Sequence, residues 1–100
     1  MAVDARDTYD WDTGRIPSAE NIPNILDTPM GIRARENQLK LLPKDRLLVF
    51  YDDTGSSLAV DLAQQLIDLD AGYDLDNIRI LELGFARWKE LLYPTSAASG

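Results

Sequence analysis

The chain has 100 residues, of which 45% are hydrophobic, which is enough for one domain with a single core but not for two. It contains no cysteine and no histidine, so a disulfide bond, a cysteine nucleophile and histidine-based acid–base or metal chemistry are excluded. The 17 acidic and 10 basic side chains give a net charge of −7, which argues against nucleic acid and anionic lipid as partners.

Residues 2–5 alternate in polarity and predict a strand that ends at the surface. Residues 6–24 are rich in Gly, Pro and polar side chains, so we expect mostly loop, with a short strand at residues 19–22. A peripheral helix is predicted over residues 28–42, because a proline suits its first turn and Pro43 stops it.

The second half of the chain predicts two strands, each followed by a helix. Residues 46–51 form a continuous apolar run, the pattern of a central strand buried on both faces. From Ser56, leucine and alanine recur at three and four residues, which predicts a helix lying on a sheet and ending at Gly72. Residues 77–83 predict a further strand, and residues 84–92 a last helix with one apolar side.

Strands and helices alternate along the chain, which predicts an α/β fold with a central parallel β-sheet and helices on its faces. In such sheets ligands bind beyond the carboxyl ends of the strands. The loop after the predicted central strand is therefore the candidate site, and it consists of Asp52, Asp53, Thr54, Gly55, Ser56 and Ser57.

Three segments carry a resemblance to a known family. They are "VDAR" at residues 3–6, "GRIPSAENIP" at residues 14–23 and "LELGFARWKE" at residues 81–90. In order and spacing they resemble the rhodanese homology domain, which implies the three-layer rhodanese-like fold. That family normally has a further strand and helix before the first segment, so we expect a domain over residues 1–94 without them, and a disordered tail over residues 95–100.

The candidate loop departs from the family pattern. The resemblance places Asp52 where the family's sulfurtransferases carry their cysteine, Ser57 where they carry an arginine and Leu58 where a serine follows it. A carboxylate cannot accept a sulfane sulfur, because a persulfide forms on a thiolate. We therefore expect no sulfurtransferase activity and no cysteine-dependent phosphatase activity. Family loops of this kind direct main-chain N–H groups inward and favour an anion. We hypothesise that Asp52 or Asp53 supplies that anion itself, or caps the helix that follows.

The resemblance implies a catalytically inactive module for protein interaction or regulation, without a cofactor and with another protein or domain as its partner. Two alternatives stay open: a metal-assisted or phosphoryl site at Asp52 and Asp53, and a flavodoxin-like small-molecule binder, because residues 49–63 also resemble the flavodoxin phosphate loop. No signal peptide or membrane-spanning segment is evident in the sequence, so we expect a cytoplasmic location by default.

Other polar and aromatic residues are assigned structural roles. Asp4 and Arg6 are expected to be structural charges at a strand end. Trp88 is expected in the core. Trp11, with Tyr9 beside it, is interpreted as a lid on the sheet edge in preference to an exposed aromatic patch.

Overall fold

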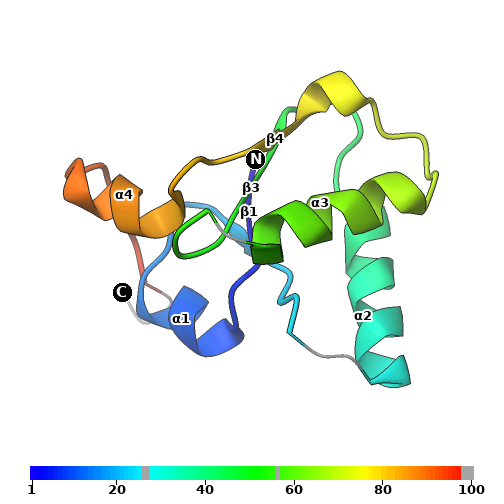
Figure 1. The fold of residues 1–100 in the computed structure, drawn as a ribbon, viewed down its shortest axis with the longest axis horizontal. Coiled ribbons are helices and arrows are strands. Elements are labelled where there is room, and N and C mark those ends of the chain that lie inside the picture. The colour runs from blue at the N-terminus through cyan, green and yellow to red at the C-terminus, as the bar shows by residue number, and fades with distance from the viewer. Residues whose placement is uncertain (26–27, 56, 98–100) are drawn as a thin grey trace.

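The computed structural model describes residues 1–25, 28–55 and 57–97. In these residues it contains a four-stranded parallel sheet with the order β2-β1-β3-β4 (Figure 1). The strands are β1 (Ala2–Asp4), β2 (Glu20–Asn21), β3 (Leu48–Tyr51) and β4 (Ile78–Ile80). The expected parallel α/β sheet is confirmed, and β3 is one of its two interior strands.

Helices cover both faces of the sheet and give three layers. The helices are α1 (Thr8–Thr13), α2 (Pro29–Lys40), α3 (Ser57–Asp68) and α4 (Gly84–Glu90), with a short 3-10 helix, η1 (Leu75–Asn77), before β4. Helices α2 and α3 lie on one side, and α1 and α4 lie on the other (Figure 1).

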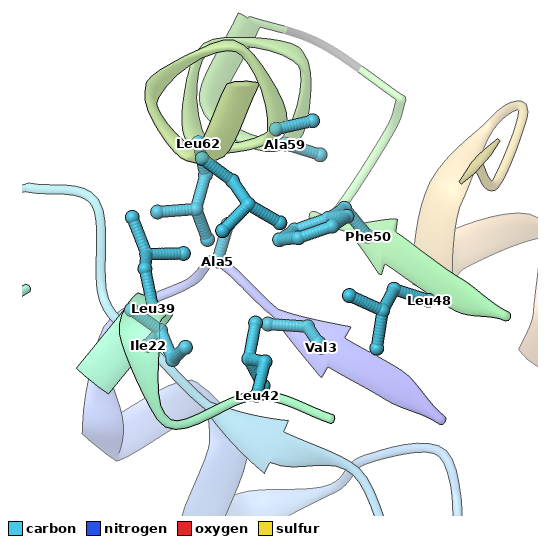
Figure 2. Close-up of a cluster of buried hydrophobic side chains, with 11 residues drawn as sticks. Val3, Ala5, Ile22, Leu39, Leu42, Leu48, Phe50, Ala59 and Leu62 are labelled. Atoms are coloured by element: carbon cyan, nitrogen blue, oxygen red, sulfur yellow. The ribbon is translucent and has the colours of Figure 1, made fainter. Parts of the chain in front are cut away.

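Alternation along β3 divides the core between the two faces. Phe50 points toward α2 and α3, where it packs in a cluster with Leu39, Leu62 and Val3 (Figure 2). The next residue, Tyr51, points to the opposite face and packs against Phe85 of α4. Both β3 side chains are fully buried, as the apolar run predicts for a strand covered on both faces.

Local hydrogen bonds decide where the helices begin and end. The Thr28 hydroxyl accepts from the N–H of Gly31 and caps α2, whose first residue is Pro29. At the other end of α2, the Tyr73 hydroxyl lies within hydrogen-bonding distance of the main-chain carbonyls of Leu39, Lys40 and Leu42, which share its one O–H donor. Burial raises the pKa of this Tyr73 phenol.

The prediction of loop over residues 6–24 is wrong for α1. This helix has six residues and buries none of them, so it has no apolar periodicity to detect. Its N-cap is Asp7, whose side chain accepts from the N–H of Asp10. All four strands are shorter than the ranges expected from the sequence, although main-chain bonds such as that from the Ala5 N–H to the Tyr51 carbonyl continue beyond their ends.

The end of the chain makes one specific contact. Arg15 and Ser96 exchange two main-chain hydrogen bonds, each 2.9 Å long, as an isolated antiparallel bridge. Residues 98–100 of the expected tail lie outside the described residues, and the boundary at residue 95 stays a prediction. None of the helices in the described part of the chain combines the length and the apolar character that crossing a bilayer requires.

Candidate functional site

The candidate loop leaves β3 at Tyr51 and enters α3 at Ser57, at the carboxyl edge of the sheet. The structure describes four loop residues after β3, which are Asp52, Asp53, Thr54 and Gly55. Ser56 lies outside the described residues. This placement beyond the end of an interior parallel strand is where α/β sheets usually bind ligands.

The Asp52 carboxylate occupies the centre of the loop. Its Oδ1 atom accepts from the N–H groups of Thr54 at 3.2 Å and Gly55 at 2.6 Å, and its Oδ2 atom accepts from the N–H of Ala59 at 3.0 Å. The Asp52 side chain is fully buried. The hypothesis that one aspartate directs its carboxylate toward inward-facing main-chain donors is therefore confirmed by the geometry.

The main chain of the same loop holds the start of α4. The carbonyls of Asp52 and Asp53 accept from the N–H groups of Phe85 and Ala86, each at 2.8 Å. A helix leaves its first N–H groups without partners inside the helix, and these two carbonyls supply partners for α4. Asp52 therefore joins two helix starts, through its carboxylate at α3 and through its carbonyl at α4.

This close approach depends on glycine. A Cβ atom added to Gly55 would lie 2.6 Å from the main-chain nitrogen of Leu83, and one added to Gly84 would lie 2.7 Å from the carbonyl carbon of Asp53. Both glycines have positive φ, at 76° and 59°, a conformation that glycine adopts without strain. Leu83 also has a positive φ of 60°, which is costly for a residue with a side chain.

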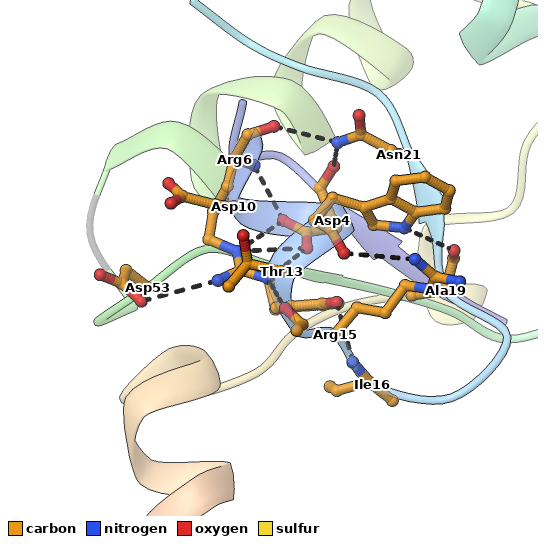
Figure 3. A network of polar contacts seen from close by, with 12 residues as sticks. Asp4, Arg6, Asp10, Thr13, Arg15, Ile16, Ala19, Asn21 and Asp53 are labelled. Atoms are coloured by element: carbon orange, nitrogen blue, oxygen red, sulfur yellow. Dashed lines mark hydrogen bonds and ion pairs between the residues drawn. The ribbon is translucent and has the colours of Figure 1, made fainter. Parts of the chain in front are cut away.

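Asp53 has a different environment from that of its neighbour. Its side chain is 67% exposed, and its Oδ1 lies 3.9 Å from an Arg6 nitrogen (Figure 3). A metal site at both aspartates would require their carboxylates to share one environment. The buried carboxylate of Asp52 and the exposed carboxylate of Asp53 do not. No group of three or more acidic side chains suited to a metal ion occurs among the residues that the structure describes.

Arg6 and Asp4 form a buried ion pair beside the loop. The Arg6 guanidinium donates from Nε at 3.0 Å and from Nη2 at 2.7 Å to the two Asp4 oxygens, and Nη2 also donates to the Gly14 carbonyl at 2.6 Å (Figure 3). The guanidinium lies 4.5 Å from the centre of the Phe85 ring. Burial alone lowers the pKa of Arg6, but the hydrogen bonds and charge of Asp4 outweigh it and the net pKa is raised. These contacts give both residues the structural role expected from the sequence.

Tyr51 lies beside this ion pair, with the Arg6 guanidinium 5.8 Å from the centre of the Tyr51 ring. It is fully buried, and its hydroxyl accepts from the N–H of Ile16 at 3.2 Å. Burial, with the nearby Asp4 charge, raises the pKa of the Tyr51 phenol well above its usual value. The phenol is therefore a neutral packing and hydrogen-bonding group at ordinary pH.

Trp11 lies over residues 15–19 in the manner of a lid. Its indole N–H donates to the Ala19 carbonyl at 2.9 Å, and the Arg15 guanidinium lies 4.0 Å from the centre of the indole ring. The interpretation of Trp11 as a lid accordingly fits the structure. Tyr9 is 76% exposed and does not share this environment.

Sequence reasoning missed the link between the loop and α4. The acidic side chains of "YDDTG" predict side-chain hydrogen bonds in the loop. The bonds to α4 are accepted by main-chain carbonyls, which every residue has and which the sequence therefore does not distinguish. The available signal was the pair of glycines at 55 and 84. Each marks a point where two main chains approach closely.

Comparisons with known proteins agree with this architecture. A family model described as "Rhodanese-like domain" matches residues 1–91. No curated protein matches the chain. Solved structures that are similar include a Bacillus halodurans protein, at 21% identity and a TM-score of 0.74 over 97% of this chain and 63% of that one.

A rhodanese-related protein from Thermoplasma volcanium matches at 24% identity and a TM-score of 0.72, over 95% of this chain and 81% of that one. An As-Sb reductase from Leishmania major matches at 26% identity and a TM-score of 0.70, over 90% of this chain and 62% of that one. The chain thus spans less than two thirds of the Bacillus and Leishmania chains. These likenesses confirm the three-layer fold that the resemblance implied.

Proposed function

The chain belongs to the family of rhodanese-like domains, and on this basis we propose that it is a non-catalytic member that serves as a protein-interaction or regulatory module. It contains no cysteine, so the cysteine on which the family's sulfur transfer depends is absent. The proposal takes Asp52 as the residue that stands in that cysteine's place.

One observation carries the proposal. The Asp52 carboxylate accepts hydrogen bonds from the main-chain N–H groups of Thr54, Gly55 and Ala59, and it is fully buried while doing so. In an active loop those donors would be available to an anionic substrate or intermediate. Here the protein's own carboxylate takes them, so the loop serves structure instead of binding.

The two alternatives have less support. A metal site at the loop would need the Asp52 oxygens, which already accept from N–H groups, and it would need further ligands beside the exposed Asp53. A flavodoxin-like phosphate site would need the same main-chain donors for its ligand. The loop also follows β3 and not the first strand, where the flavodoxin resemblance would place it.

The decisive experiment restores the missing chemical groups. We expect the wild-type chain to transfer no sulfur from thiosulfate to cyanide. We expect the double variant Asp52→Cys, Ser57→Arg to gain transfer, because a thiolate would then face the N–H groups of Thr54, Gly55 and Ala59. Far-ultraviolet circular dichroism establishes that the variant is folded.

A matched control tests whether activity depends on the position of the cysteine or only on the presence of a thiol. Asp53→Cys places a cysteine one residue further on, at a position that is 67% exposed, whereas the N–H groups of Thr54, Gly55 and Ala59 donate to Asp52. We expect this variant to remain inactive. Turnover of thiosulfate or arsenate by the wild-type chain would contradict the proposal, and arsenate is included because one similar structure is of an As-Sb reductase.

A further inference from the structure

Strand β2 forms one edge of the sheet, and its outer side faces away from β1. In a parallel ladder, the N–H and C=O groups of one residue point to the same neighbour, and those of the next residue point to the opposite side. The Ile22 N–H donates to the Asp4 carbonyl at 3.0 Å, so the main-chain groups of Ile22 face β1. The N–H and C=O of Asn21 therefore face outward, in the orientation that an added strand would use.

A cavity of about 290 Å³ opens beside this edge, between β2 and the end of α2. Its apolar lining includes Ile22, Leu42 and Pro43, and its outer wall is Leu41, which is 84% exposed. Figure 2 shows Ile22 and Leu42 on the same side of the sheet, below Leu39. The size and lining suit a single large apolar side chain.

The rim carries one carboxylate. Of the described residues that line the cavity, Glu20 is the only one with an ionisable side chain, and it is exposed, whereas the terminal amino group of Met1 donates to the Leu47 carbonyl at 2.7 Å. Because side chains alternate along a strand, Glu20 lies on the same face of the sheet as Ile22 and its carboxylate stands beside the cavity. The chain as a whole carries a net charge of −7, which favours a positively charged partner.

We propose that this edge and cavity bind an extended segment of a partner protein. The segment runs alongside β2, pairs its main chain with Asn21, places an apolar side chain in the cavity and sets a Lys or Arg beside Glu20. This inference rests on the proposed function as an interaction module, and it specifies the surface and the kind of partner.

The test uses a displayed library of random ten-residue peptides, selected against the whole chain. We expect the selected sequences to share an apolar residue with a Lys or Arg close to it. One such peptide is then synthesised, and amide hydrogen exchange is measured by NMR with and without it. The Asn21 amide should exchange more slowly when the peptide is bound, while the Ile22 amide, already bonded to Asp4, serves as the internal reference.

Variants at exposed positions test the cavity and its rim without disturbing the core. Leu41→Asp should weaken peptide binding by about tenfold, because it places a charge on the apolar wall. Met30→Asp is the matched control, since Met30 lies in α2, the helix that Leu41 caps at its C-terminal end, is 82% exposed and is not among the residues that line the cavity. Glu20→Lys should weaken binding of the selected peptide by about fivefold, and it should improve binding of a peptide whose basic residue is changed to Glu.

Any one of the following outcomes overturns the proposal. It fails if no peptide is selected, or if the selected peptide protects amides elsewhere, such as those of α4, and not Asn21. It also fails if Leu41→Asp and Met30→Asp weaken binding equally, or if Asn21 becomes protected by self-association as the protein concentration rises. Binding at another surface would leave the interaction-module proposal intact, whereas sulfur transfer by the wild-type chain would defeat that proposal and not the peptide site.

Discussion

Replacing Asp52 by Ala is the most informative perturbation of stability. The change removes the acceptor of the N–H groups of Thr54 and Gly55, whose bonds are part-buried, and of Ala59, whose bond is buried. Water can reach the first two donors, so most of the cost comes from the Ala59 N–H, whose bond to Asp52 also caps α3. An unsatisfied buried donor costs about 1–3 kcal/mol, and a lost N-cap, which here is the same bond, costs about 0.5–2 kcal/mol.

Because both figures describe the same bond, they are not added, and Asp52→Ala is predicted to lower the free energy of unfolding by about 1–3 kcal/mol. A domain of this size has roughly 5–15 kcal/mol in total, so the variant should fold but melt about 5–25 °C lower. Urea denaturation followed by fluorescence of Trp11 and Trp88 measures the difference.

Asp53→Ala is the matched control, because it removes the same charge one residue away. The Asp53 carboxylate is exposed and lies 3.9 Å from Arg6, so we expect a loss below about 1 kcal/mol. A loss at Asp52 no larger than the loss at Asp53 would refute the reasoning, since it would show that the buried hydrogen bonds contribute nothing specific.

Three further changes test the surroundings of the loop. Tyr51→Phe removes a phenol whose pKa is raised by burial. The neutral phenol contributes its full stability below about pH 10 and loses it as the pH rises further. The unfolding free energy of the wild-type chain should therefore fall more steeply than that of the variant above about pH 10. Parallel pH profiles would contradict this. Arg6→Met leaves the Asp4 carboxylate buried without its partner and should cost about 3–5 kcal/mol in urea denaturation. The double variant Asp4→Asn, Arg6→Met should cost less, and an equal or larger cost would count against a charge effect. Leu92→Gly should raise the melting temperature, with a gain of about 0.5–1 kcal/mol, because Leu92 has a φ of 58° and is 90% exposed; an unchanged or lower value would show that the left-handed backbone carries no strain there.

The sequence predicted the sheet well where apolar patterns were strong. The continuous run that ends at Tyr51 and the leucine repeat that includes Leu62 and Leu66 have only one good burial arrangement, and the structure has it. The position of the loop followed from the order of these two elements. The acceptor role of Asp52 followed from the preference of such loops for an anion, although the sequence could not choose between Asp52 and Asp53.

What the sequence could not predict has physical causes that no pattern records. Helix α1 depends on the Asp7 cap and on a Trp11 hydrogen bond to Ala19, and it buries no side chain that periodicity would reveal. The bonds from α4 to the loop join main-chain atoms of residues more than 30 positions apart. The outward orientation of the Asn21 main chain depends on which residues of β1 and β2 are paired, and that register is fixed only by the folded sheet.

The most direct test of the central claim is an NMR titration with thiosulfate at constant ionic strength, applied to the wild-type chain and to Asp52→Ala. The amides of Thr54, Gly55 and Ala59 report on the loop, because they donate to the Asp52 carboxylate. We predict no saturable shift of these amides in the wild-type chain and a saturable shift in the variant, where the donors are released. Saturable binding of thiosulfate at these amides in the wild-type chain would contradict the account.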